Sequence, residues 1–331
     1  MQKKFITNLG FLLVLNFLIK PFYILGIDAE IINRVGAETY GVYFTLFNFS
    51  FLFNIVLDLG INNYSTSTLA KSEHLLPKFF SRLMSLKVLL LGIYVLFTLL
   101  MGLVWGYSNY EIKLLLLLVL NQGIVALIMY LRSNLSGVQL FFKDSIVSVL
   151  DRFLMIFICS VLLWGGFTNK PFEIEWFIYA QTVSYCITLL LALFWVWKEA
   201  AFIKLKFDNI FSLAILKQSL PYALLVLLMS FYYRSDSVML QKMLEDGSKQ
   251  AGYYAQAYRF FEAGNMVAYL FAGLLLPIFS KMIKLNQSLV GIVDISFKIV
   301  FSGAIILSVM CFQFGEEILS WRYEDISSQS A

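Results

Sequence analysis

The feature that most constrains this chain is a series of nine long apolar runs separated by short polar connections. The runs cover approximately residues 5–27, 41–57, 88–105, 114–131, 146–167, 174–197, 219–240, 253–280 and 299–315. A helix needs about 20 apolar residues to cross the hydrocarbon core of a bilayer. Inside lipid the backbone must satisfy its own hydrogen bonds, which a helix does within one segment. The sequence therefore predicts an all-α, polytopic transmembrane protein with about nine spans.

Composition supports this class and excludes most soluble ones. Apolar residues make up 60% of the 331 positions and charged residues only 14%, and the mean hydropathy is +0.78. Soluble domains carry about 25% charged residues, so a soluble enzyme is excluded. The single His74 and the scattered Cys159, Cys186 and Cys311 show no metal-ligand or disulfide spacing. We therefore expect no metal and no cofactor.

The distribution of charge predicts an orientation. If the amino terminus is cytoplasmic, most of the 25 Lys and Arg residues fall on the inner side, as the positive-inside rule requires. Lys87 and Arg152 are counted on that side, whereas Asp28 is counted among the acids on the outer side. Two windows, 75–87 and 284–298, mix charged and apolar residues at helical spacing, and we interpret them as interfacial lead-ins rather than spans.

An internal repeat relates the two parts of the chain. Gly26-Ile27-Asp28 is predicted to form a polar turn between the first two spans, and Gly41-Val42-Tyr43 then opens a helix. An acid followed by a Gly-Tyr helix start returns in Asp236 and Gly252-Tyr253-Tyr254, six spans later. An even offset preserves orientation, so this pattern predicts a parallel repeat of two six-helix halves.

The repeat also predicts the domain organisation. Residues 1–200 are expected to form an amino-terminal six-helix lobe, and residues 201–331 an incomplete carboxy-terminal lobe of about three helices. After Gly315 the chain turns polar where a loop to a tenth span would begin. The chain is therefore predicted to be truncated at its carboxyl end.

Six motifs, in this order along essentially the whole chain, carry a resemblance to a known family. They are Val35–Tyr43 (VGAETYGVY), Asp58–Gly60 (DLG), Ser219–Tyr222 (SLPY), Arg234–Asp236 (RSD), Gly252–Arg259 (GYYAQAYR) and Leu276–Phe279 (LPIF). Together they resemble the bacterial polysaccharide and O-antigen flippases of the multidrug/oligosaccharidyl-lipid/polysaccharide exporter superfamily. The resemblance implies twelve to fourteen helices in two lobes around a central cationic cavity that opens alternately to each side.

The implied function is translocation of undecaprenyl-pyrophosphate-linked oligosaccharide across the bacterial inner membrane by alternating access. It implies lipid-linked oligosaccharide and membrane lipids as partners, with a polysaccharide polymerase and a chain-length regulator as candidate protein partners. No nucleic acid is expected. The chain is therefore expected to be a transporter for surface polysaccharide, lipopolysaccharide or O-antigen assembly, and not an enzyme.

Ionisable side chains at membrane depth cost at least ~2.5 kcal/mol each on insertion, so each is expected to have a structural or functional role. Lys20, Arg234 and Arg259 fall within a slab of roughly 10 Å, as the helical rise predicts. The resemblance implies that their helices line the cavity, and an Arg fork or a Lys charge suits a pyrophosphate. These three are the expected substrate-binding residues. The alternative is that Lys20 and Arg234 snorkel to the outer boundary.

Two acids accompany these cations. Glu262 stands three residues after Arg259, the spacing of an ion pair on one helix, and Asp236 stands two residues after Arg234. A structural ion pair is one interpretation of Glu262, and coupling to an ion gradient is the other. Glu262 and Asp236 are therefore candidates for ion coupling.

Three other functions remain open at this stage. A drug or metabolite exporter of the same superfamily would share the architecture, although three embedded cations against two acids favour an anionic substrate. A membrane-bound polysaccharide polymerase or glycosyltransferase would need catalytic motifs on sizeable aqueous loops, and none is present in the sequence. The missing helices also allow an inactive, truncated remnant.

Overall fold

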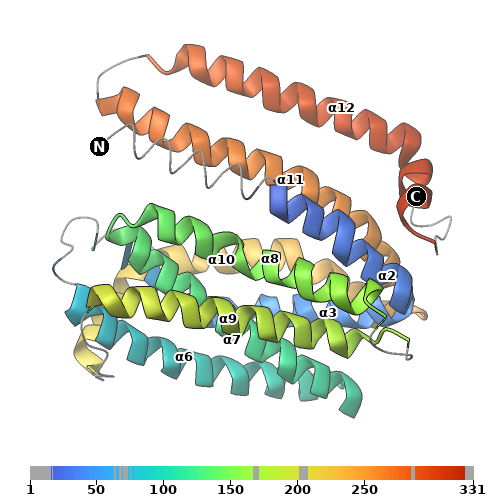
Figure 1. Cartoon of the computed structure of the whole chain (residues 1–331), viewed down its shortest axis with the longest axis horizontal. Helices are drawn as coiled ribbons and strands as arrows, with labels where there is room; N and C mark the ends of the chain where they lie inside the picture. The colour runs from blue at the N-terminus through green and yellow to red at the C-terminus, as the bar shows by residue number, and fades with distance from the viewer. Residues whose placement is uncertain are drawn as a thin grey trace.

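The computed structural model describes residues 16, 18–62, 65–66, 69, 74, 76–166, 171–200, 208–284 and 288–324. Within these ranges the chain forms helices that run roughly along one axis (Figure 1), and no β-strand is present. Five of the described helices are long and apolar enough to cross a membrane: Phe80–Val104, Asn109–Gly137, Phe141–Trp164, Ile174–Glu199 and Val290–Arg322. The predicted all-α, multi-pass membrane class is confirmed, and the number of nine spans stays a prediction.

The first helix does not turn where the sequence predicts a turn. Helical residues 18–22 continue into the π-helix η1 (Tyr23–Asp28) and then into α2 (Ala29–Val35). The chain breaks at Gly36, where φ is 80°, a value that glycine adopts without steric cost. The predicted polar turn at residues 26–28 is therefore wrong. Its acid is not in water but only 1% exposed. The Oδ2 atom of Asp28 pairs with Arg259 and accepts a hydrogen bond from Tyr40.

The helix that follows Gly36 is interrupted, and the buried Lys87 stabilises the segment after the interruption. Helix α3 (Ala37–Leu52) is followed by the short α4 (Ile55–Asp58), which ends in a left-handed residue. Lys87 of α6 (Leu76–Val104) donates to the Leu57 carbonyl oxygen at 2.9 Å and to Asp58 Oδ1 at 2.6 Å. Residues 76–87 of this window thus supply the opening turns of α6. Lys87 is buried rather than interfacial because α4 satisfies its charge.

The remaining helices are long. They are α7 (Asn109–Gly137), α8 (Phe141–Trp164), α9 (Ile174–Ala200), α10 (Asn209–Met243), α11 (Gly247–Lys284) and α12 (Val290–Arg322). Helices α6, α7, α9 and α8 pack on one another in that order, while α3 packs against both α10 and α11. Helix α12 lies at the edge of the bundle beside α11 (Figure 1). The sequence elements before and after residue 200 therefore meet along α3.

The two boundaries predicted for the last span differ from the structure. The window 284–298 is not a separate lead-in, because α12 begins at Val290 and passes through it. The helix also continues past Gly315 to Arg322, whose Nε and Nη2 atoms donate to the Leu25 and Gly26 carbonyl oxygens, each at 2.7 Å. These acceptors belong to the π-helix, so contact with the first helix stabilises residues that the sequence assigns to a polar tail.

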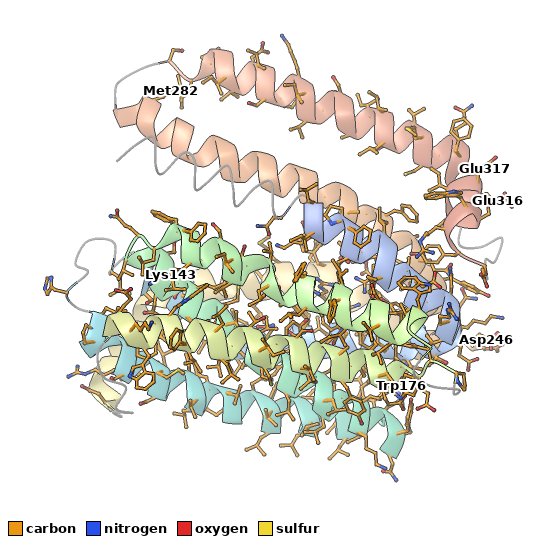
Figure 2. The ribbon with its side chains drawn as sticks, in the orientation of Figure 1. Lys143, Trp176, Asp246, Met282, Glu316 and Glu317 are labelled. Atoms are coloured by element: carbon orange, nitrogen blue, oxygen red, sulfur yellow. The ribbon has the colours of Figure 1, made fainter. Side chains whose placement is uncertain are left out.

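The two ends of the bundle carry different residues (Figure 2). Lys143 and Met282 lie at one end, and Trp176, Asp246, Glu316 and Glu317 lie at the other. We refer to them as the Lys143 end and the Asp246 end. The identity of the cytoplasmic end stays a prediction. The lobe boundary at residues 200 and 201 also stays a prediction, and residues 201–207 lie outside the described residues.

Candidate functional site

A cavity of about 550 Å³ lies between the first helix, α3, α8, α9, α10 and α11. Its wall consists of Lys20, Tyr23, Ile24, Tyr43, Phe47, Phe51, Arg152, Gln181, Tyr185, Met229, Ser230, Tyr233, Arg234, Tyr258, Arg259, Phe261, Glu262 and Asn265. Aromatic rings dominate this wall, and its charged groups are predominantly cationic. Both halves of the predicted repeat contribute, so the site exists only where the two halves meet.

The structure brings the three predicted cations together. Lys20, Arg234 and Arg259 all line this cavity, and Glu262 lines it with them. Asp236 does not: its side chain is exposed, and its Oδ2 accepts a hydrogen bond from the Tyr254 hydroxyl at 3.1 Å. The shared cavity is an observation, whereas the substrate-binding and coupling roles of these residues stay predictions.

Arg259 is the most heavily paired of the cations. Its Nε forms an ion pair with Asp28 Oδ2 at 2.5 Å, and its Nη1 donates to Glu262 Oε2 at the same distance. Its Nη2 donates to the Tyr40 hydroxyl at 2.6 Å, and that hydroxyl in turn donates to Asp28 Oδ2 at 2.9 Å. The guanidinium therefore joins the π-helix of the first helix to α3 and α11 through a buried network.

Arg234 is also held by several partners. Its Nη1 donates to Asn48 Oδ1 at 3.0 Å and lies 3.5 Å from Glu262 Oε1. Its guanidinium lies 4.8 Å from the Phe51 ring centroid, within the range of a cation–π contact. Glu262 therefore bridges Arg234 and Arg259. The sequence predicts the ion pair between Arg259 and Glu262, but not its extension to α10.

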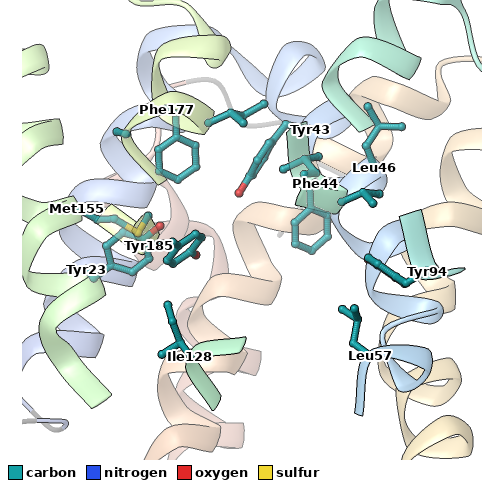
Figure 3. Packing of buried hydrophobic residues seen from close by; sticks show 14 of the residues in the cluster. Tyr23, Tyr43, Phe44, Leu46, Leu57, Tyr94, Ile128, Met155, Phe177 and Tyr185 are labelled. Atoms are coloured by element: carbon teal, nitrogen blue, oxygen red, sulfur yellow. The ribbon is translucent and has the colours of Figure 1, made fainter. Parts of the chain in front are cut away.

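The other end of the wall carries Lys20 and Arg152. Arg152 lies over the Tyr23 ring at 4.7 Å from the centroid and hydrogen-bonds Tyr185. Figure 3 shows Tyr23, Met155 and Tyr185 gathered beside one another in the buried core. Lys20 stands one helical turn before Tyr23 on the same face. Within the described part of the chain, no ion pair involves Lys20.

Sequence reasoning misses two of these charged groups, Asp28 and Arg152. Asp28 directly follows the apolar run 5–27, where hydropathy assigns a charge to the adjacent loop. Asp28 pairs with a residue 231 positions away in sequence, so no local spacing marks it. The positive-inside count places Arg152 on the inner side, although its position inside the predicted run 146–167 is the sequence signal that identifies it as embedded.

A close helix crossing lies between the cavity and the Asp246 end. A Cβ atom on Gly41 would collide with the Ser248 carbonyl oxygen, and one on Gly252 would collide with the Ala37 carbonyl oxygen. Small residues four apart on each helix let α3 and α11 approach at backbone distance. The two glycines are the ones that open the matching helices of the predicted repeat, so the two copies touch each other there.

Side chains strengthen contact at this end. Gln241 Nε2 donates to Glu111 Oε1 at 3.3 Å, and Lys242 Nζ lies 4.8 Å from the Tyr107 ring centroid. These contacts join the end of α10 to the first turn of α7 and to the connection that precedes it. Every α3 and α11 residue on the cavity wall lies on the Lys143 side of the glycine crossing. The cavity is therefore separated from the Asp246 end by packed helix ends.

Metal binding has no support in the described residues, where no group of three or more His, Cys, Asp or Glu side chains is placed to hold an ion. A family model with the description "Polysaccharide biosynthesis protein" matches residues 7–283. No curated protein and no solved structure matches the chain. The matched range includes every residue on the cavity wall, from Lys20 to Asn265.

Proposed function

Because the chain belongs to the polysaccharide biosynthesis protein family, we propose that it translocates undecaprenyl-pyrophosphate-linked oligosaccharide across the bacterial inner membrane. The cavity carries this proposal. It is lined by Lys20, Arg152, Arg234 and Arg259, four cations inside a multi-pass membrane protein. A pyrophosphate does not enter hydrocarbon unpaired. Ionisable side chains at membrane depth typically mark the pathway of a substrate or an ion.

The proposed mechanism is alternating access without covalent chemistry on the substrate. The headgroup and its sugars enter the cavity from the cytoplasmic leaflet, while the polyprenyl tail stays in the bilayer. The packed Asp246 end then opens and the opposite end closes. In this proposal the amino terminus is cytoplasmic, and the product serves surface polysaccharide or O-antigen assembly by a polymerase and a chain-length regulator. The cations that line the cavity lower the energy barrier for moving the anionic headgroup across the membrane.

A reconstituted transport assay tests the proposal. Purified protein is placed in liposomes that contain a labelled undecaprenyl-pyrophosphate oligosaccharide, and the fraction of label reached by an impermeant glycosidase is followed over time. We expect translocation by the unchanged chain and a loss of at least about tenfold in Arg259→Gln, because the substitution removes the cation that pairs with Asp28 and Glu262 and joins the helices around the cavity. Arg34→Gln, which changes an exposed cation outside the cavity, is the control.

Liposomes with the unchanged protein that translocate no more label than empty ones would contradict the proposal. Equal loss in Arg259→Gln and Arg34→Gln would contradict the role of the cavity. A labelled lipid-linked sugar without the pyrophosphate serves as the substrate control, and its translocation at the same rate would show that the cations do not recognise the headgroup.

A further inference from the structure

The cations of the cavity fall into two groups that differ in charge compensation. Arg234 and Arg259 share Glu262, and Arg259 also pairs with Asp28, so two positive charges are balanced by two negative ones. Asp28 is only 1% exposed and Arg259 only 11%. An anion that bound these arginines would have to displace carboxylates already held at hydrogen-bond distance. This group therefore holds the helices together and offers little net attraction to a ligand.

Lys20 and Arg152 form the second group, which lacks this compensation. The charged groups that act on Lys20 are Arg152 and Arg132, which repel it, and Asp151, which attracts it less. Asp151 approaches Arg152 only to 3.7 Å, and neighbouring residues on a helix point to different faces. Arg132 already donates to Asp144 at 2.7 Å. With two cations and one adjacent acid, Lys20 and Arg152 are the group of the wall that keeps excess positive charge.

The helix register brings these two side chains to the same level. Asn16 donates to the Ser148 hydroxyl at 3.3 Å, and Arg152 covers the Tyr23 ring. Lys20 stands between Asn16 and Tyr23, and Arg152 stands one turn after Ser148. The first helix and α8 are thus aligned side by side, and both cations face the same cavity. The Tyr23 and Tyr185 side chains on the adjacent wall carry hydroxyl groups that suit phosphate oxygens.

We propose that Lys20 and Arg152 form the diphosphate-binding subsite of the cavity, and that Arg234 and Arg259 are positioning residues that join the two halves through Glu262 and Asp28. The identity of the diphosphate as a lipid headgroup rests on the proposed function, whereas the location of the subsite does not. Arg152 presents a planar fork to two phosphate oxygens, and Lys20 adds a compact charge beside it. The four paired groups keep the wall in place around the ligand.

Binding of inorganic pyrophosphate to the purified full-length chain, measured by isothermal titration calorimetry in detergent, tests this assignment. Two double variants keep the net charge of the protein unchanged. In Asp151→Asn with Arg152→Gln we expect affinity to fall at least about tenfold, because a charged hydrogen bond contributes about that factor. In Arg234→Gln with Glu262→Gln we expect a change of less than about threefold. Lys20→Gln is expected to lose affinity, and Lys20→Arg to retain it.

A larger loss of pyrophosphate affinity in the Arg234 and Glu262 double variant than in the Asp151 and Arg152 double variant would overturn the assignment. Pyrophosphate affinity that is unchanged in both Lys20→Gln and the Arg152 variant would overturn it as well. Size-exclusion elution and thermal unfolding of each variant show whether it folds. If the Arg152 variant does not fold, the comparison of Lys20→Gln with Lys20→Arg decides alone. Farnesyl diphosphate, tested beside inorganic pyrophosphate, distinguishes the sources: tighter binding of the prenyl compound identifies a lipid headgroup, and equal binding identifies a free anion.

Pyrophosphate binding that depends on Lys20 and Arg152, in a protein that fails to translocate lipid-linked oligosaccharide, would contradict the proposed function alone. Translocation by the unchanged chain, with pyrophosphate binding that does not depend on either residue, would contradict the subsite alone.

Discussion

At the scale of single residues, the buried pair of Asp28 and Arg259 should be the most sensitive ionic contact of the cavity. Asp28→Asn keeps the shape of the side chain but leaves Arg259 with Glu262 as its one remaining carboxylate. Breaking a buried pair typically costs 3–5 kcal/mol, and the remaining partner reduces this, so we expect about 2–3 kcal/mol of lost stability. Thermal and denaturant unfolding in detergent measures it.

Asp294→Asn is the matched control, because it breaks the pair with Lys298, whose side chain is 69% exposed. An exposed pair contributes about 0–1 kcal/mol, so this variant should unfold almost as the unchanged chain does. Equal losses in the two variants would show that the network around Arg259 does not stabilise the bundle.

Glu262 is the residue whose role in coupling is open to a direct test. Its two carboxylate oxygens hold Arg234 and Arg259 on different helices. If Glu262 releases one arginine when it binds a proton or sodium, Glu262→Gln should make translocation independent of pH and of the sodium gradient. Rates in liposomes with imposed gradients measure this. Unchanged pH and sodium dependence in Glu262→Gln would remove this residue from any coupling role, and Glu175→Gln, away from the cavity, is the control.

At the scale of helices, the crossing of α3 and α11 should tolerate no side chain at its two glycines. In Gly41→Ala and in Gly252→Ala the new methyl group meets a backbone carbonyl oxygen that no rotamer change moves away. Overpacking of this kind costs about 1–3 kcal/mol. Gly92→Ala in α6, with open space around its Cβ, should instead gain about 0.5–1 kcal/mol. Thermal unfolding of the three variants gives the comparison, and equal stability in all three would contradict the crossing.

The sequence predicts helices well and their interruptions poorly. Apolar runs such as 114–131 and 174–197 lie within α7 and α9, because about 20 apolar residues suffice to identify a span. The turn predicted at Asp28 is wrong because Arg259, 231 positions away, pairs with this acid inside the bundle, and the helix continues as a π-helix. The same cause hides Lys87, whose charge is satisfied by α4. Local patterns do not report such long-range pairs.

The candidate site was predictable in part for the same reason. Lys20, Arg234 and Arg259 stand inside long apolar runs. A charged side chain there is costly to place in the membrane, so the sequence alone identifies these residues as candidates for function. Arg152 lies as far inside the run 146–167 as Arg259 lies inside the run 253–280, so it is identifiable in the same way. Asp28 directly follows the run 5–27, in an expected loop, and is not. The division of the cations into a charge-balanced group and a group with excess positive charge depends on contacts such as Arg234 with Glu262, between helices whose relative placement the sequence does not specify.

At the scale of the whole molecule, alternating access requires the packed Asp246 end to open during each cycle. Glu111 and Gln241 are in contact across this end, on α7 and α10. In a chain whose Cys159, Cys186 and Cys311 are replaced by Ala, cysteines at these two positions can be joined by a short, cleavable thiol reagent. We expect the joined protein to translocate no more label than empty liposomes, and reduction of the linker to restore the rate.

The control pair is Lys143→Cys with Glu199→Cys, whose native side chains are in contact at 2.8 Å. These residues lie on α8 and α9, which belong to the same predicted lobe, so a linker between them should leave translocation unchanged. Transport that continues at the full rate after complete linkage of positions 111 and 241 would mean that this end does not open. Because a bistable bundle moves as packed units rather than bending continuously, arrest by the first linker and not by the second would also locate the moving boundary between α7 and α10.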